Sequence, residues 1–278
     1  MNKEETVRSE AEMHSQPVSG EAWQIDLESG ATLAMVAVEK GEYQRGSRRF
    51  FAGEKPLHTV VVSHTFWIAR HLLTQAQYQA VAGSNPAHFP GAERPVEMVN
   101  WYEAVEWCRR LTEREKDKDR LPEGFVYRLP TEGEWEYAAR GGQAGRGCKY
   151  AGSNRVDEVA WYGGGMGGNS DFMTSPVGMK QANELGLYDM SGNVWEWCHD
   201  WQEDYPPFQQ LVDPVGPLQG SHRVLRGGSW GYEPRHCLIT RRDGLTPGHR
   251  YCDVGFRPVL APELSRLRAR PPRHPSRL

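Results

Sequence analysis

Tyr232 and Cys237 lie five residues apart and are one candidate pair for metal binding in this sequence. A cysteine thiolate suits soft Cu(I), which needs only two strong sulfur ligands. The phenol of Tyr232 is a hard donor and is usually protonated, so it is a poor ligand for Cu(I). Cys252, His236 or His249 could contribute sulfur or nitrogen, but no spacing demands it. We therefore expect no copper cofactor and an inert, buried Cys237.

A second candidate for chemistry is the turn at residues 192–196 (GNVWE). Asn193 offers an amide oxygen and Glu196 a carboxylate, with backbone carbonyls between them. Such oxygen ligands suit Ca²⁺, which accepts irregular cages. An equally open alternative is a tight turn in which Asn193 bonds to backbone. Calcium at Asn193 and Glu196 is thus one of two readings of this turn.

Three capping boxes locate the helices that follow the first strands. They pair Thr74 with Gln77, Asn100 with Glu103, and Thr131 with Glu134. Glycines predict the ends of the first and third helices, at Gly83 and Gly141. Apolar residues of the second helix recur on one face and predict that Cys108 is in the core. Glu132, Glu134 and Glu136 alternate along the third helix and are not expected to converge as an acid and base pair.

Residues 32–38 and 57–69 are predicted to be strands, the second rich in valine. On the second, His58, Val60, Val62 and His64 would share one partly exposed face. Beyond Gly142 the regular periodicity fades into short strands, turns and aromatic anchors. A long loop-rich half of this kind indicates that loops carry the function. Residues 1–22 are expected to be disordered, residues 23–262 to be one domain, and residues 263–278 to be a basic flexible tail.

Composition limits the partners and the compartment. The formal net charge is -3, which gives no reason to expect nucleic acid or an acidic membrane as a partner. The sequence contains no apolar run of signal-peptide or membrane-spanning length, so we expect a cytoplasmic protein. Five cysteines without paired spacing indicate free thiols.

Four strings occur in an order that resembles one known family. They are LLTQAQY at 72–78, YRLPTEGEWEYAAR at 127–140, GLYDMSGNVWEW at 186–197, and the stretch 223–259, with GGSW at 227–230 and VGFR at 254–257. Together they resemble the formylglycine-generating enzyme family, also called the sulfatase-modifying factor family, from about Trp23 to Ala261. The resemblance implies a variant of the C-type lectin fold: a single α+β domain with little regular secondary structure.

The resemblance also implies roles for particular residues. In the active enzymes, two cysteines five residues apart hold copper and oxidise a substrate cysteine. Cys237 matches the second cysteine, whereas Tyr232 stands at the position of the first. Ser229 matches a serine near the active site, although a turn hydroxyl bonded to backbone is the simpler interpretation. The residues that match Asn193 and Glu196 line a calcium site in the family.

One branch of this family comprises the variable proteins of diversity-generating retroelements. Residues 231–253 contain no Lys, Gln, Met or Trp, the residue types that adenine-directed mutagenesis of asparagine codons cannot reach. Glu233 is also unreachable and would be a fixed position. A diversified segment would form a solvent-facing surface rich in tyrosine and arginine, as in evolved binding loops. Its members would be Tyr232, Arg235, His236, Arg241, Asp243, His249, Tyr251 and Asp253.

Two functions of different class follow. The favoured one is a module that binds a protein or a small molecule at residues 231–253, and the lost cysteine supports it. The alternative is an oxidoreductase that acts on a thiol or another small group, with Cys237 and Ser229 as catalytic residues and a non-standard metal site. Family membership supports the alternative, but fold by itself does not establish function.

Overall fold

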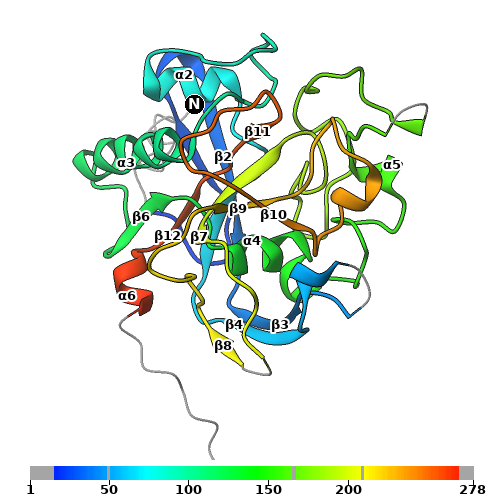
Figure 1. The fold of residues 1–278 in the computed structure, drawn as a ribbon. Coiled ribbons are helices and arrows are strands. Elements are labelled where there is room, and N and C mark those ends of the chain that lie inside the picture. The colour runs from blue at the N-terminus through cyan, green and yellow to red at the C-terminus, as the bar shows by residue number, and fades with distance from the viewer. Residues whose placement is uncertain (1–15, 49–50, 165–166, 208–209, 269–278) are drawn as a thin grey trace, which may run out of the picture.

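In the part of the chain that the structure describes, the strands form three sheets connected mainly by loops (Figure 1). The computed structural model describes residues 16–48, 51–164, 167–207 and 210–268. Between the helix that ends at Ala139 and the strand that begins at Trp195, the elements with defined bounds are the short helices η4 (Gly142–Ala144) and α5 (Val156–Val159). The α+β, loop-rich architecture predicted from the sequence is confirmed.

The five-stranded sheet joins the two ends of the described chain. Its order is β1, β2, β5, β12, β6, with bounds Trp23–Asp26, Thr32–Val38, Phe66–Ala69, Val259–Pro262 and Phe125–Arg128. All neighbouring strands are antiparallel. β5 and β12 are buried along their whole length, as expected for apolar strands at the centre of a sheet. The short helix η2 (Glu28–Gly30) lies between β1 and β2.

The predicted strand at residues 57–69 is wrong in one respect, because it is two strands in two different sheets. The chain turns at Ser63, whose backbone N–H and hydroxyl both donate to the Asp213 carboxylate, at 2.8 and 2.5 Å. The first part, β4 (His58–Val62), pairs with β3 (Gly41–Arg45) and β8 (Leu211–Val212) in the three-stranded sheet. The second part is β5 in the five-stranded sheet.

The predicted exposed face of this strand is also wrong. His58, Val60, Val62 and His64 are all buried. The His58 ring packs edge-on against Tyr205 at 4.7 Å between centroids. His64 lies between two carboxylates, with Nε2 2.9 Å from Glu134 and Nδ1 3.2 Å from Asp213. Burial by distant segments explains the error, because local alternation does not reveal it.

The four-stranded sheet carries the candidate site. Its order is β10, β9, β7, β11, with bounds Arg242–Leu245, Arg223–Arg226, Trp195–Trp201 and Val254–Gly255. β7 pairs antiparallel with β9 and parallel with β11. Residues 227–253 therefore connect β9 to β11 of the same sheet. This connection contains the helix η6 (Pro234–His236) and the strand β10.

All three predicted helices are present, and each begins with its capping box. They are α2 (Gln75–Ala82), α3 (Trp101–Asp117) and α4 (Glu132–Ala139). Gly83 ends α2 in the left-handed conformation at φ 81°. α4 ends at Ala139 with Arg140 as its C-cap residue, and Gly141 follows in the left-handed conformation at φ 88°. Cys108 is buried in the main core, as predicted.

The three glutamates of α4 are buried, which their alternation did not predict. Each is matched by arginines from other segments. Arg242 Nε lies 2.8 Å from Glu132, Arg128 Nη2 lies 2.7 Å from Glu134, and Arg226 bonds to Glu136. Burial alone would raise the pKa of Glu132, but Arg242, Arg45 and Arg226 lower it to about 2. Together with the ion pair between Arg45 of β3 and Glu132, these ion pairs connect α4 to all three sheets.

The ends of the chain are more ordered than predicted over the residues that the structure describes. Residues 1–15 of the predicted disordered segment lie outside those residues, but the turn at 18–21 is anchored, because Trp67 donates to the Glu21 carbonyl at 2.9 Å. At the other end, α6 (Leu264–Arg268) is a helix with Leu267 buried. The predicted flexible tail thus includes a packed helix, and its residues 269–278 lie outside the described ranges. No helix within the described ranges is long and apolar enough to cross a membrane.

Candidate functional site

Residues 227–253 are held on the four-stranded sheet by close backbone contacts. Gly227 and Gly228 have φ of 94° and 78°, a conformation that glycine adopts readily. A side chain at Gly228 would place its Cβ only 2.6 Å from the His236 carbonyl oxygen. Further along, Gly163 donates to the Tyr232 carbonyl at 2.8 Å. The predicted recognition segment therefore has a fixed backbone frame.

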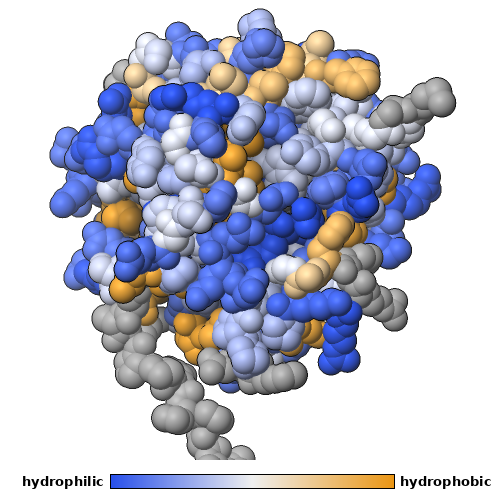
Figure 2. Space-filling model, in the orientation of Figure 1, coloured by the Kyte–Doolittle hydropathy of each residue, from blue (hydrophilic) through white to orange (hydrophobic). Residues whose placement is uncertain are grey.

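The structure places all eight predicted recognition residues within reach of solvent. Four are exposed: Tyr232, Arg235, His249 and Tyr251. The other four are half-buried: His236, Arg241, Asp243 and Asp253. Neighbours in the same segment, including Cys237, Leu238 and Ile239, are buried and anchor it. Figure 2 shows a mainly hydrophilic surface over β9 and β10, interrupted by a few apolar groups.

Contacts bring most of these residues together. The Tyr232 and His236 rings lie 5.0 Å apart, and both pack against Trp195 of β7. Arg241 Nη2 is 3.2 Å from Asp243 Oδ2. Partial burial, together with Asp253 and Asp243, raises the pKa of Tyr232, so its phenol stays protonated and can donate a hydrogen bond. The His249 and Tyr251 rings form a second pair, 6.1 Å apart.

Ser229 bonds to backbone, as the simpler interpretation of its turn expected, and also to a side chain. Its hydroxyl donates to Asp253 Oδ2 at 2.9 Å and accepts a long contact from the Gly231 N–H at 3.4 Å. Burial raises the pKa of Asp253. The pair ties the start of the recognition segment to its end, 24 residues later.

Cys237 is completely buried in a small cluster with Ala160 and Tyr162. Burial raises the pKa of its thiol to about 12. The protonated, enclosed thiol of Cys237 does not supply the thiolate that Cu(I) requires. Tyr232, at the position of the family's first cysteine, offers only a protonated phenol. Tyr232 and Cys237 therefore do not fit a two-sulfur copper site. Across the described ranges, no three His, Cys, Asp or Glu side chains are grouped to hold a metal ion.

The two predicted calcium ligands are already engaged. The Asn193 amide exchanges two hydrogen bonds with the backbone of Ser175, at 3.1 and 3.0 Å. The Glu196 carboxylate accepts hydrogen bonds from Nε and Nη2 of Arg257, both at 2.9 Å. The Trp135 indole donates to the same carboxylate. Because an arginine neutralises this carboxylate, Asn193 and Glu196 as arranged do not fit a calcium ion.

Sequence reasoning missed a neighbour of the recognition segment that comes from elsewhere in the chain. The Arg241 guanidinium lies 4.3 Å from the centre of the Phe51 ring, next to η3 (Ala52–Glu54), and the Phe51 and His236 rings are 6.1 Å apart. Thr240 also donates to Glu54 at 2.8 Å. Nothing near Phe51 in the sequence signals this contact, because it depends on the tertiary fold.

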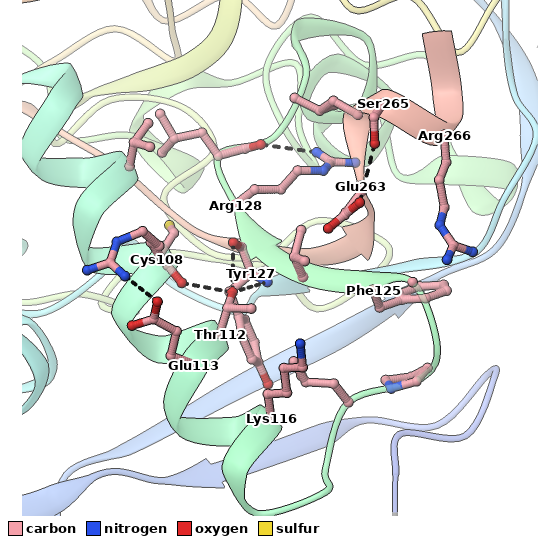
Figure 3. Close-up of a pocket in the computed structure, with 18 of the residues that line it drawn as sticks. Cys108, Thr112, Glu113, Lys116, Phe125, Tyr127, Arg128, Glu263, Ser265 and Arg266 are labelled. Carbon is pink, nitrogen blue, oxygen red and sulfur yellow. Dashed lines mark hydrogen bonds and ion pairs between the residues drawn. The ribbon is translucent and has the colours of Figure 1, made fainter. Parts of the chain in front are cut away.

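A hollow of about 1080 Å³, away from the recognition segment, lies between α3, β6 and α6 (Figure 3). Apolar side chains and charges of both signs line it. The Thr112 hydroxyl accepts from the Tyr127 N–H at 2.9 Å, and its own hydrogen lies between the Cys108 carbonyl at 2.9 Å and the Tyr127 carbonyl at 3.2 Å, so it connects α3 to β6.

Comparisons with known proteins agree with this architecture. Variable protein 1 of Treponema denticola is 32% identical, superposes with a TM-score of 0.77, and matches over 89% of this chain and 100% of its own. Formylglycine-generating enzyme of Mycobacterium tuberculosis is 29% identical over 82% of this chain and 98% of that protein. Serine/threonine-protein kinase pkn1 of Chlamydia pneumoniae is 31% identical over 80% of this chain, which spans only 37% of that protein.

The family itself is identified by the match of residues 26–262 to the model described as the sulfatase-modifying factor enzyme 1-like domain. This match covers most of the chain and includes the four strings noted above. The chain therefore belongs to the sulfatase-modifying factor family and has its formylglycine-generating-enzyme-like, C-type-lectin-like fold.

Proposed function

We propose that this chain is a binding module whose recognition surface lies in residues 231–253. The observation that carries the proposal is the contrast within that segment: the eight predicted contact residues reach solvent, whereas the thiol that chemistry would need is buried and protonated. Tyrosine and arginine bury large areas at low entropic cost, so they suit a recognition surface.

The similarity to variable protein 1 of Treponema denticola supports a binding role. It extends over nearly the whole chain, at a TM-score of 0.77. By this analogy we further propose that residues 231–253 are diversified by a retroelement, with Glu233 as a fixed position. Sequencing of the gene's surroundings tests this second step. A reverse transcriptase gene and a near-identical template repeat are expected, and absence of both contradicts diversification.

A peptide selection tests the binding role without a known ligand. A random peptide library displayed on phage is selected against the protein, and the recovered peptide is mapped by hydrogen exchange. We expect slower exchange in residues 231–253 and in the adjoining turn at 51–54. Slower exchange confined to other parts of the chain, such as the hollow between α3 and α6, would contradict the proposal.

An oxidoreductase remains the alternative function, because family membership favours it. Reduced protein titrated with Cu(I) separates the two functions, with Cys237→Ala as the matched control. The binding-module proposal predicts no stoichiometric copper binding that depends on Cys237. Stoichiometric binding that disappears in Cys237→Ala would instead favour the enzyme, with Cys237 and Ser229 at its centre.

A further inference from the structure

A hollow of about 480 Å³ lies beside η6, at the border of the recognition surface. Its lining comes from three separate parts of the chain: Phe51, Lys149 with Tyr150, and Pro234, Arg235 and Leu238. A hollow of this volume is large enough for a drug-sized ligand or a large side chain. Only Pro234, Arg235 and Leu238 belong to the segment singled out from the sequence.

The apolar groups that line the hollow are suited to a flat ring. Phe51 and Tyr150 contribute aromatic rings, and Leu238 is a buried apolar side chain. Aromatic rings prefer offset or edge-on contact with other rings, which adds to the gain from burying apolar area.

Among the described residues, the charged groups that line the hollow are both cationic. They are Lys149 and Arg235, and none of the described lining residues carries a carboxylate. Arg235 Nε contacts Glu233 at 2.8 Å, but both side chains are more than half exposed, so this ion pair is weak and a ligand can replace it. A third cation, Arg241, stacks on the Phe51 ring at 4.3 Å. The pKa of His236 is lowered by burial and then by Arg241 and Arg235, which agrees with a positive local potential.

The backbone around the hollow is fixed before a ligand arrives. The Lys149 carbonyl accepts from the Ile239 N–H at 3.0 Å, which joins two of the three lining segments. The Lys149 N–H donates to the Asn154 side chain, also at 3.0 Å. Binding therefore requires little reordering of the chain, which favours affinity.

We propose that this hollow is a subsite of the recognition surface for an aromatic ring that carries a carboxylate or lies directly beside one. The ring packs against Phe51 and Tyr150, and the carboxylate is bound by Lys149 and Arg235. The same chemistry has two sources, a free aryl carboxylate or an aromatic side chain next to Asp or Glu. This inference rests on the proposed binding function, because it adds a ligand class to that surface.

Two matched pairs of probes test the subsite by isothermal titration calorimetry. The first pair is 2-naphthoate and the uncharged 2-naphthamide. The second is the peptide acetyl-Glu-Trp-Glu-amide and its Gln-Trp-Gln analogue. We expect the charged member of at least one pair to bind with one-to-one stoichiometry, about fivefold tighter than its neutral partner. Binding by naphthoate alone indicates a small-molecule ligand, and binding by the peptide indicates a protein ligand.

The double variant Lys149→Gln with Arg235→Gln locates the binding. It should lower the affinity of the charged probe about fivefold, while the control Lys118→Gln at the end of α3 leaves the affinity unchanged. Failure of all four probes to bind, no preference for charge, or equal binding to the double variant would overturn the subsite. Circular dichroism checks that the variants fold.

The outcomes distinguish this inference from the proposed function. Tyr232 and Tyr251 do not line the hollow, so hydrogen-exchange mapping of the selected peptide can succeed when the naphthoate test fails. In that case the surface binds, and only the subsite is wrong. Naphthoate binding at the hollow together with peptide mapping elsewhere would retain the subsite and contradict the larger surface.

Discussion

The side chains of residues 229–253 divide into a buried set and an exposed set. Cys237 and Ser229 face inward, one into an apolar cluster and the other toward Asp253. Tyr232 and Tyr251 are 41% and 50% exposed, and tyrosine is a residue type enriched among the side chains that dominate binding interfaces. Buried side chains thus anchor the segment, and exposed side chains are free to contact a partner.

Burial of Cys237 predicts slow alkylation. A thiol with a pKa of about 12 is ionised in roughly one part in ten thousand at pH 8, and only the thiolate reacts. Iodoacetamide should therefore label the half-buried Cys148 and Cys252 well before Cys237 in the native protein. Peptide mass spectrometry over time measures the three rates. If Cys237 reacted as fast as Cys252, its thiol would be activated and the enzyme alternative would gain support.

The sequence predicted the eight exposed or half-exposed side chains but not their neighbours. The residue types within 231–253, tyrosine and arginine among them, are local signals. Phe51, Lys149 and Tyr150 reach the same surface through tertiary contacts, which no local pattern encodes. The hydrogen bond from Ser229 to Asp253 was missed for the same reason.

Strands β7 and β11 are joined beneath the recognition segment by a buried ion pair. Arg257 follows β11 and binds the Glu196 carboxylate of β7, and both side chains are 0% exposed. Arg257 also donates to the carbonyls of Ala69 and Tyr188. Arg257 thus connects three parts of the chain. The position of β11, where the recognition segment ends, depends on this arginine.

Arg257→Met should therefore be strongly destabilising. It leaves Glu196 charged, buried and unpaired, at a cost of about 3–5 kcal/mol in the free energy of unfolding. The double variant Glu196→Gln with Arg257→Met removes the unpaired charge and should regain part of that loss. Urea unfolding of both variants measures the difference. If the double variant were no more stable than the single variant, the unpaired carboxylate would not be the source of the cost.

Asp200, on β7, gives the contact with α4 a dependence on pH. Its carboxylate accepts from the Glu132 N–H at 2.9 Å, and burial, followed by the negative charge of Glu132, raises its pKa to about 7. In the unfolded chain the value is 3.8, so between these two pH values the folded state retains a proton that the unfolded state releases. This group's contribution to stability therefore falls as the pH rises through that window and stays low above it.

The variant Asp200→Asn tests whether this carboxyl makes the free energy of unfolding fall as the pH rises. The amide oxygen can still accept from Glu132, but the group no longer ionises. Wild-type protein should lose more stability than the variant between pH 5 and pH 8, as measured by urea unfolding at each pH. Parallel losses in the two proteins would mean that Asp200 is ionised in the folded state.

Helices were easier to predict than strands, for a physical reason. Each capping box at Thr74, Asn100 and Thr131 lies within four residues of chain, and all three start helices. The strand at 57–69 looked continuous because valines run through it. Its break at Ser63 depends on Asp213, which lies 150 residues away. Likewise, the buried glutamates of α4 are matched by arginines that local spacing cannot reveal.

At the scale of the whole molecule, a rigid family scaffold carries a surface built from one late segment and two earlier loops. The four-stranded sheet and the ion pairs of α4 fix the scaffold. The exposed side chains of residues 231–253, with Phe51 and the loop at 149–150 beside them, form the proposed surface. Such a division allows the surface to vary while the core remains constant, which is the requirement for a variable binding protein.

The most direct test of a recognition surface at 231–253 is the affinity of a phage-selected peptide for a surface variant. Tyr232→Ala with Tyr251→Ala removes two exposed aromatic side chains, and Leu218→Ala, which removes an exposed apolar side chain from another segment, is the control. Isothermal titration calorimetry should give a Kd at least about tenfold weaker for the tyrosine variant, because exposed tyrosines dominate such interfaces. The control should bind as wild type does. An unchanged Kd in the tyrosine variant would contradict the assignment of this surface.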